Sequence, residues 1–174
     1  MKNFFYYIWI FFLTIVLVSI SNIVFSQSEK INWIEVEKIK ELQNNYKKKI
    51  MIDLYTDWCG WCKVMDRTTF SDKKIIEKIN SDFYPIKINA EYKGDITFNN
   101  HTFKYVDLKP RGINEIAYYL TNGQLSYPMT IFLDEDFRII TLLPGYHKSN
   151  FFKSVLDYIG EDHWKETSWD DFIK

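Results

Sequence analysis

Cysteine is scarce in this sequence of 174 residues, which has two, Cys59 and Cys62, three positions apart. A fold held together by disulfides needs more cysteines, spread along the chain, so that class is excluded. A bridge within this pair would close a very small loop and would stabilise the fold little. The two thiols are therefore of interest for their chemistry rather than as a structural cross-link.

An excess of charge of one sign is lacking as well. The sequence holds 22 basic and 23 acidic residues, which give a formal net charge of -1. Recognition of nucleic acid needs a basic face, and this balance gives no broad electrostatic reason for one. We therefore expect no nucleic-acid partner.

No pattern of metal ligands is present in the sequence either. Zinc usually takes four ligands, and the chain has no second cysteine pair. The histidines His101, His147 and His163 fall at unrelated positions. We expect neither a metal nor another cofactor, so the chemistry must come from side chains.

Apolar residues, by contrast, are plentiful. They make up 47% of the sequence, which argues against disorder, and the length suits one domain. We assign residues 27–160 to that domain. The tail over 161–174 carries Trp164, Trp169 and Phe172, and we expect it to pack back on the domain.

Residues 1–26 have the layout of a secretory signal peptide. Lys2 precedes a nearly uninterrupted apolar run that extends to Phe25, and Ser26 offers a small residue at the cleavage point. The alternative is an uncleaved membrane anchor, because about 20 apolar residues can span a bilayer. Both predictions place the domain outside the cytoplasm, in the periplasm, and the second adds a membrane contact.

The rest of the chain alternates between helical and strand patterns. The spacing of apolar residues predicts helices over 33–46, 59–70, 72–80, 113–121 and 149–159, and strands over 50–55, 83–88, 130–133 and 137–142. Asn32 and Glu35 have the spacing of a capping box for the first helix. Asn99-Asn100 is typical of a hairpin turn. Ser149 or Asn150 is expected to cap the last helix, with Gly160 just past its end.

The order of these elements predicts an α/β fold. Helices between the first two strands imply that those strands pair in parallel, whereas the last two strands form an antiparallel hairpin. The result is a mixed sheet covered by helices on both faces.

The cysteine pair gains a chemical meaning from its place in this order. If Cys59 starts a helix, the unpaired N–H groups and the helix dipole favour its thiolate, which is the nucleophilic form. Cys62 then lies about one turn into the helix, less exposed, and becomes the resolving thiol. Between them, Gly60 permits close approach of a substrate backbone.

At this point the sequence resembles a known family. The segment from Asp53 to Lys63, with its Trp-Cys-Gly-Trp-Cys-Lys signature, resembles the active-site segment of the thioredoxin superfamily, and especially of bacterial secreted thioredoxin-like proteins. Lys87-Ile88-Asn89 is similar to the family's next strand, Tyr127-Pro128 to its cis-proline loop, and Pro144-Gly145 to its late glycine turn. The resemblance implies a thioredoxin-like three-layer sandwich with an insertion before the cis-proline loop.

The resemblance also implies roles for the residues around the thiols. Cys59 would attack a substrate disulfide, and Cys62 would resolve the mixed disulfide. Asp53 would accept the proton of Cys62, with its pKa raised by burial, and Lys87 would sit beside it. The alternatives are that Asp53 reaches water at a strand end and that Lys87 is a plain surface residue.

The same resemblance implies a substrate-binding surface. A cis bond between Tyr127 and Pro128 would bring backbone next to the sulfurs, where an extended chain could pair with it. Trp58 and Trp61 would supply apolar contact for the partner. The alternatives are a trans proline in an ordinary turn and tryptophans that only pack on the domain.

The function that these expectations predict is thiol–disulfide exchange, as a reductase of protein disulfides outside the cytoplasm. Its partners would be protein thiols and disulfides and a membrane or periplasmic electron donor. Trp61 replaces the proline of thioredoxin, and that dipeptide tunes the redox potential, so a disulfide oxidase or isomerase is an alternative. A binding or chaperone-like module with secondary cysteines is another.

Overall fold

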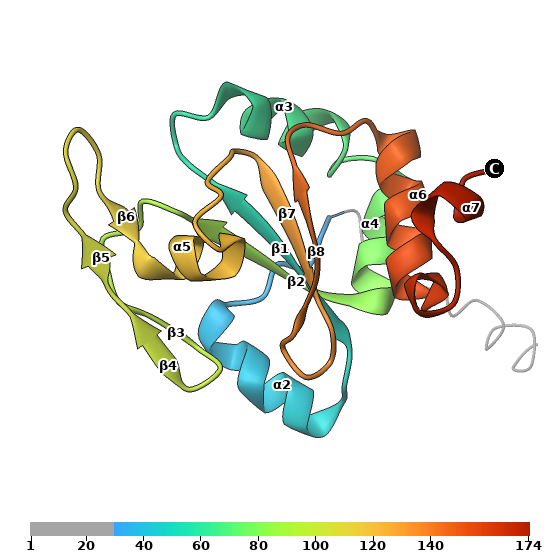
Figure 1. The fold of residues 1–174 in the computed structure, drawn as a ribbon, viewed down its shortest axis with the longest axis horizontal. Helices are drawn as coiled ribbons and strands as arrows, with labels where there is room; N and C mark the ends of the chain where they lie inside the picture. Colours follow the sequence, from blue (N-terminus) through green and yellow to red (C-terminus); the bar gives the residue numbers. More distant parts are fainter. Residues whose placement is uncertain (1–29) are drawn as a thin grey trace, which may run out of the picture.

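The computed structural model describes residues 30–174, and its centre is a mixed four-stranded sheet (Figure 1). The strand order is β2-β1-β7-β8, with bounds Phe83–Asn89, Lys49–Tyr55, Met129–Leu133 and Ile139–Pro144. β1 pairs in parallel with β2 and antiparallel with β7, and β8 pairs antiparallel with β7. The predicted mixed sheet is confirmed. The signal-peptide prediction lies outside the described residues.

Helices cover both faces of this sheet, which makes the three layers (Figure 1). On one face, α2 (Ile39–Asn45) and α5 (Glu115–Thr121) pack against the alternate residues of β1 that include Ile52. On the other face, α3 (Gly60–Thr68), α4 (Lys73–Asp82) and α6 (Ser149–Gly160) pack against the set that includes Met51. Because β1 is buried on both sides, its sequence is apolar throughout except at its ends and at one carboxylate.

The insertion forms two small antiparallel ribbons beside the main sheet (Figure 1). One joins β3 (Ile96–Phe98) to β4 (His101–Phe103), and the other joins β5 (Tyr105–Val106) to β6 (Ile113–Asn114). The predicted turn between β3 and β4 is confirmed: Asn99 and Asn100 have φ of 46° and 67°, the left-handed region that asparagine tolerates in tight hairpins.

The first predicted helix is wrong at its start. Ile34 donates its N–H to the carbonyl of Pro85, 2.8 Å away, and forms a parallel bridge with Ile86, so this stretch is extended. A 3₁₀ turn over 36–38 then leads into α2. The expected capping box is absent, because the backbone N–H of Asn32, from which the side chain of Glu35 would have to accept, donates to Oδ1 of Asn80 at 2.9 Å. The free edge of β2 competes with the helix for these residues.

Other boundaries differ by one or two residues. Ile113 belongs to β6 rather than to a helix, and the next residue, Asn114, caps α5. The second strand of the final hairpin begins at Ile139, because Phe137 takes a left-handed turn conformation. α6 begins at Ser149 after an N-cap at Lys148 that makes no side-chain bond, and Gly160 lies inside α6 rather than after it.

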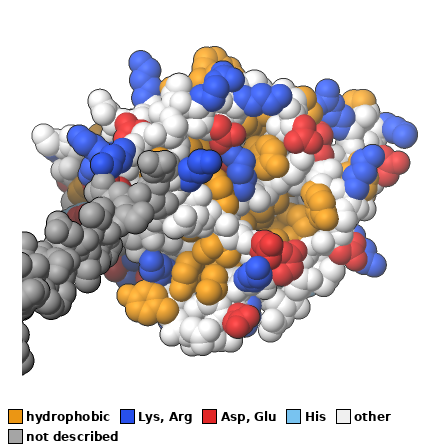
Figure 2. Space-filling view, turned by 180° about the vertical axis from the view of Figure 1, so that it is seen from behind, with side chains coloured by type: hydrophobic (Ala, Val, Ile, Leu, Met, Phe, Trp, Pro, Cys, Tyr) orange, Lys and Arg blue, Asp and Glu red, His pale blue; other side chains and the backbone are white. Residues whose placement is uncertain are grey.

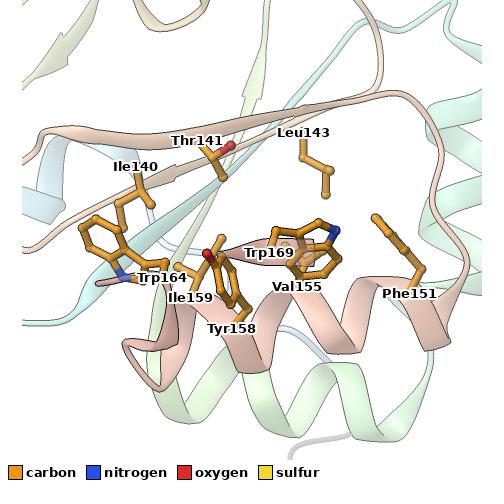
Figure 3. Close-up of a pocket in the computed structure, with 9 residues that line it drawn as sticks. All are labelled: Ile140, Thr141, Leu143, Phe151, Val155, Tyr158, Ile159, Trp164 and Trp169. Carbon is orange, nitrogen blue, oxygen red and sulfur yellow. The ribbon is translucent and has the colours of Figure 1, made fainter. Parts of the chain in front are cut away.

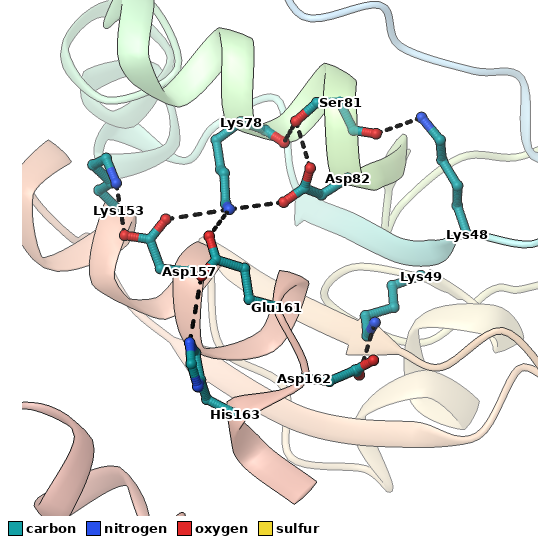
Figure 4. Close-up of polar contacts among 10 residues, drawn as sticks. All are labelled: Lys48, Lys49, Lys78, Ser81, Asp82, Lys153, Asp157, Glu161, Asp162 and His163. Atoms are coloured by element: carbon teal, nitrogen blue, oxygen red, sulfur yellow. Dashed lines mark hydrogen bonds and ion pairs between the residues drawn. The ribbon is translucent and has the colours of Figure 1, made fainter.

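The tail over 161–174 lies along α6 and β8. Trp164 and Trp169 from the tail line an apolar pocket of about 420 Å³, together with Leu143 of β8 and Val155 of α6 (Figure 3). Charged groups add to this contact: Lys49 at the start of β1 is buried and lies 2.8 Å from Asp162 (Figure 4). The described tail is thus joined to the domain by ring contacts and an ion pair.

The surface between these elements mixes polar and apolar groups. Viewed from behind, side chains of both charge signs share the face, and apolar side chains gather in patches between them (Figure 2). Within residues 30–174, no helix is both long and apolar enough to cross a bilayer.

Candidate active site

Cys59 and Cys62 form a disulfide at the start of α3, with an S–S distance of 2.05 Å. Cys59 is the N-cap of the helix, and its sulfur accepts a hydrogen bond from the backbone N–H of Cys62 at 3.0 Å. The backbone N–H of Cys59 donates to the carbonyl of Thr56 and closes the turn that follows β1. In the dithiol form, this place at the positive end of a helix favours the thiolate of Cys59.

The expected difference in exposure between the two cysteines is not observed. Cys59 and Cys62 are both buried, each with 4% of its surface exposed. Because each sulfur covers the other in the disulfide, exposure does not separate their roles in this state. The distinction between them comes from the helix N-terminus, where only Cys59 occupies the capping position.

Asp53 lies on β1, on the sheet face that α3 covers, and it is 2% exposed. Its Oδ2 accepts from the Nζ of Lys87, 2.8 Å away, and its Oδ1 has no partner among the described residues. Burial raises the pKa of Asp53, and the neighbouring ammonium only partly offsets that effect. The alternative in which Asp53 reaches water at a strand end is therefore wrong.

Lys87 faces Asp53 because the two residues are partners in the parallel register of β1 and β2. Its ammonium also bonds the carboxylate of Asp66 on α3. Burial lowers the pKa of Lys87, but the two carboxylates outweigh burial and raise it. Lys87 is not a plain surface lysine. Because Asp66 lies one helical turn after Cys62, the ion pairs connect the helix that carries Cys62 to Asp53.

The peptide bond between Tyr127 and Pro128 is cis. The carbonyl of Pro128 accepts from the N–H of Gly145 at 2.8 Å, and Gly145 has a φ of 87°, which favours glycine. The next residue, Met129, pairs with Leu54 near the end of β1 that leads to the cysteines. The cysteine segment and the cis-proline loop, which the sequence singles out, thus meet at the same end of the two central strands, β1 and β7.

Two tryptophans flank the disulfide, and both are exposed, Trp58 at 53% and Trp61 at 61%. The indole N–H of Trp58 donates to Glu91, and its ring packs edge-on against Tyr127 with centroids 5.9 Å apart. Trp61 stacks on Tyr146 at 5.4 Å. Both indoles contact the domain and also keep apolar surface open to a partner.

Gly60, which follows Cys59 in the chain, faces open space. A Cβ built on Gly60 would meet no atom within 4 Å, so the fold of the chain does not require glycine at this position. The space it leaves is available to a partner.

Four residues near the site escaped the sequence analysis: Asp66, Glu91, Arg111 and Tyr146. Asp66 carried a signal, because it follows Cys62 by four positions on a predicted helix. The others contact the two tryptophans across loops, and no periodicity marks such contacts. Over residues 30–174, no group of three or more His, Cys, Asp or Glu side chains is placed to hold a metal ion.

Fold and site together define a class, the thioredoxin-like thiol–disulfide oxidoreductases, whose reactive group is a close cysteine pair at a helix N-terminus. The chain belongs to the family described as "Thioredox_DsbH: Protein of unknown function, DUF255", whose model matches residues 21–170.

Sequence relatives point to the same chemistry. The chain is 28% identical over 95 residues to the "Thiol:disulfide interchange protein DsbD" of Photorhabdus laumondii, covering 53% of this chain and 15% of the relative. It is 24% identical over 130 residues to that of Actinobacillus pleuropneumoniae, covering 71% of this chain and 19% of the relative. The chain thus spans less than a fifth of these relatives.

Solved structures show the same fold. A thioredoxin-fold protein from Helicobacter pylori aligns with a TM-score of 0.58 and 18% identity, over 86% of this chain and 88% of that one. A structure described as "DsbH Oxidoreductase" aligns with a TM-score of 0.55 and 12% identity, over 78% and 88% of the two chains. These likenesses confirm the predicted thioredoxin-like architecture.

Proposed function

We propose that the protein reduces disulfides of other proteins outside the cytoplasm and is itself reduced by a membrane or periplasmic electron donor. The observation that carries this proposal is the position of Cys59 at the N-cap of α3, with the buried carboxylate of Asp53 and the partly buried Lys87 behind that helix. The names of the DsbD relatives support disulfide exchange, and the apolar segment over 1–26 supports export.

The reaction follows from these positions. The thiolate of Cys59 attacks one sulfur of the substrate disulfide, so that a mixed disulfide forms and one substrate thiol leaves. Asp53 then takes the proton of Cys62, whose thiolate attacks the sulfur of Cys59 and releases the second substrate thiol. Two electrons pass to the substrate, and the protein ends with the disulfide seen in the structure. The donor restores the dithiol.

Reduction of insulin in the presence of dithiothreitol tests the activity. Wild-type protein is expected to accelerate precipitation of the insulin chains, and Cys59→Ser to abolish the acceleration. Cys62→Ser retains the attacking thiol, so this variant, reduced, freed of dithiothreitol and then mixed with insulin, is expected to trap a mixed disulfide with the substrate, visible by mass spectrometry. Equal activity of wild type and Cys59→Ser would refute the proposal and favour a binding module.

Titration of the cysteine pair against a glutathione buffer tests the direction. A reduction potential near that of thioredoxin, about −270 mV, supports a reductase, whereas a value near that of DsbA, about −120 mV, supports an oxidase. Isomerase activity on scrambled ribonuclease is the complementary assay.

A further inference from the structure

Arg111 reaches the candidate site from the insertion. It lies in the loop that joins β5 to β6, and its guanidinium carbon is 4.5 Å from the centre of the Trp58 ring. Trp58 directly precedes Cys59, and its ring also touches Tyr127, the residue before the cis proline. The insertion therefore places a cation over the indole that lies between the attacking cysteine and the cis-proline loop.

The loop that carries Arg111 is anchored by specific contacts. A Cβ on the next residue, Gly112, would lie 2.1 Å from the hydroxyl oxygen of Tyr105 and 2.6 Å from the backbone carbonyl oxygen of Val106, which cannot swing aside, so the ribbon requires glycine there. The buried side chain of Asn114 donates to the carbonyls of Tyr92 and Gly94, at 3.2 Å and 2.9 Å. The C-terminal end of the loop, next to Arg111, is thus attached to neighbouring structure.

Arg111 forms no ion pair within residues 30–174, and its guanidinium lies over the Trp58 ring. Arg138, by comparison, bonds Asp134 and Asp136, and Lys109 in the same loop as Arg111 has an ion pair with Asp107. Glu91, the other charged group at the indole, is occupied by the indole N–H. The guanidinium of Arg111 is exposed and forms no ion pair within the described residues, so its N–H groups are open to a partner's carboxylate over the ring of the residue that precedes Cys59.

We propose that Arg111 is a specificity-determining residue that pairs with an acidic side chain beside the reacting cysteine of the partner protein. The proposal rests on the proposed function, because it concerns the substrate of the same cysteine pair. A guanidinium can stack on an indole and still present its N–H groups to a carboxylate in a two-pronged geometry. A partner with a basic residue at that place would be repelled, so the contact selects among substrates.

Three synthetic peptides test this inference. They are identical except for one residue next to a single cysteine, which is Glu, Gln or Lys, and each cysteine carries a methylthio group as a mixed disulfide. The full chain, reduced and freed of reductant, is mixed with each peptide, and the freed peptide thiol is quantified over time. Wild type is expected to reduce the Glu peptide about threefold to tenfold faster than the Lys peptide, with the ratio falling at high ionic strength.

Variants at two positions in one loop separate the possible results. Arg111→Gln is expected to remove the preference for the Glu peptide, Arg111→Glu to reverse it, and Arg111→Lys to keep the Glu peptide faster than the Lys peptide. The quantity compared is the ratio of the Glu-peptide rate to the Lys-peptide rate within each variant. Lys109→Gln is the matched control, because Lys109 is 89% exposed and pairs with Asp107, and it is expected to behave as wild type.

Two results would overturn the inference. One is a Glu-to-Lys ratio that survives in Arg111→Gln. The other is an equal slowing of all three peptides in that variant, which would mean that the cation acts on Cys59 or on the Trp58 ring. If wild type reduces none of the peptides, the proposed function fails, and the inference that rests on it fails as well.

Discussion

The ammonium group of Lys87 lies 2.8 Å from the carboxylate of Asp53, in the interior of the sheet face that carries the redox helix. The same ammonium bonds Asp66 on that helix, so one lysine is shared by two carboxylates. Lys87 cannot fully neutralise both. Burial, with a smaller contribution from the charge of Asp66, raises the pKa of Asp53 in spite of the adjacent cation, and a raised pKa suits the proton-acceptor role that we propose for it.

The first prediction concerns Asp53→Asn and the resolution step. An amide cannot accept the proton of Cys62, so release of substrate from the mixed disulfide is expected to slow by about 100-fold. In wild type the rate should rise with pH as Asp53 ionises, through a pKa above its usual range, and Asp53→Asn should lack that rise. Quenched single-turnover assays across the pH range measure both effects.

Asp66→Asn provides the matched variant for that profile. The negative charge of Asp66 contributes to the raised pKa of Asp53, so its removal should move the rising limb to lower pH. A profile for Asp53→Asn that coincides with wild type would exclude Asp53 as the proton acceptor.

The second prediction concerns stability and pH. Asp53 has a higher pKa in the folded protein than in the unfolded chain, so the folded state binds more protons between the two values. The contribution of Asp53 to the free energy of unfolding is therefore fully present below the pKa that this group has in the unfolded chain. It is lost as the pH rises through the pKa that Asp53 has in the folded protein. Asp53→Asn removes that loss, and it should gain on the order of 1 kcal/mol relative to wild type between mildly acidic and alkaline pH.

Urea unfolding of the oxidised proteins at several pH values measures this difference. Subtracting wild type from Asp53→Asn cancels the contributions of the other titrating groups. A difference that is constant with pH would show that Asp53 titrates alike in the folded and unfolded chain.

The sequence was informative where a residue broke a local pattern. Asp53 stands out because it interrupts an otherwise apolar strand, and the family resemblance implies Lys87 beside it; the parallel register of β1 and β2 places the two residues opposite each other. The Asn99-Asn100 turn was likewise readable, because asparagine tolerates the left-handed conformation that a tight hairpin needs. Local chemistry is enough for such features.

Features that depend on the packing of distant segments were not readable. The extended conformation of Ile34 depends on the free edge of β2, which no helical periodicity reports. The contact of Arg111 with Trp58 needs the position of the insertion, whose short strands carry little pattern of their own. The roles of such residues emerge only from the three-dimensional arrangement.

The third prediction concerns Gly60→Ala. Gly60 has no positive φ and its missing side chain points to open space, so alanine should fit and stabilise α3 by about 0.5–1 kcal/mol. If a partner backbone approaches here, the added methyl group should slow insulin reduction by about tenfold while leaving a small disulfide such as hydroxyethyl disulfide unaffected.

Gly145→Ala is the contrasting variant for that test. Its Cβ also meets open space, but its φ of 87° disfavours any residue with a side chain, so it should lose about 1 kcal/mol. Equal insulin reduction by Gly60→Ala and wild type would mean that the partner does not approach Gly60.

The fourth prediction concerns the tail. The ring of Trp169 lies 5.7 Å from that of Phe151 and 5.2 Å from that of Tyr158, and it lines the pocket beside β8 (Figure 3). Trp169→Ala removes these contacts from a half-buried site, so it should reduce the free energy of unfolding by about 1–3 kcal/mol in urea titrations.

Ile173→Ala, in the same tail but 54% exposed, is the control and should stay within about 0.5 kcal/mol of wild type. Because the pocket includes neither cysteine, insulin reduction well below the melting temperature should not change in either variant. A tail that is detached in solution would give equal stabilities for both variants, since Trp169 would then contribute nothing to the folded state.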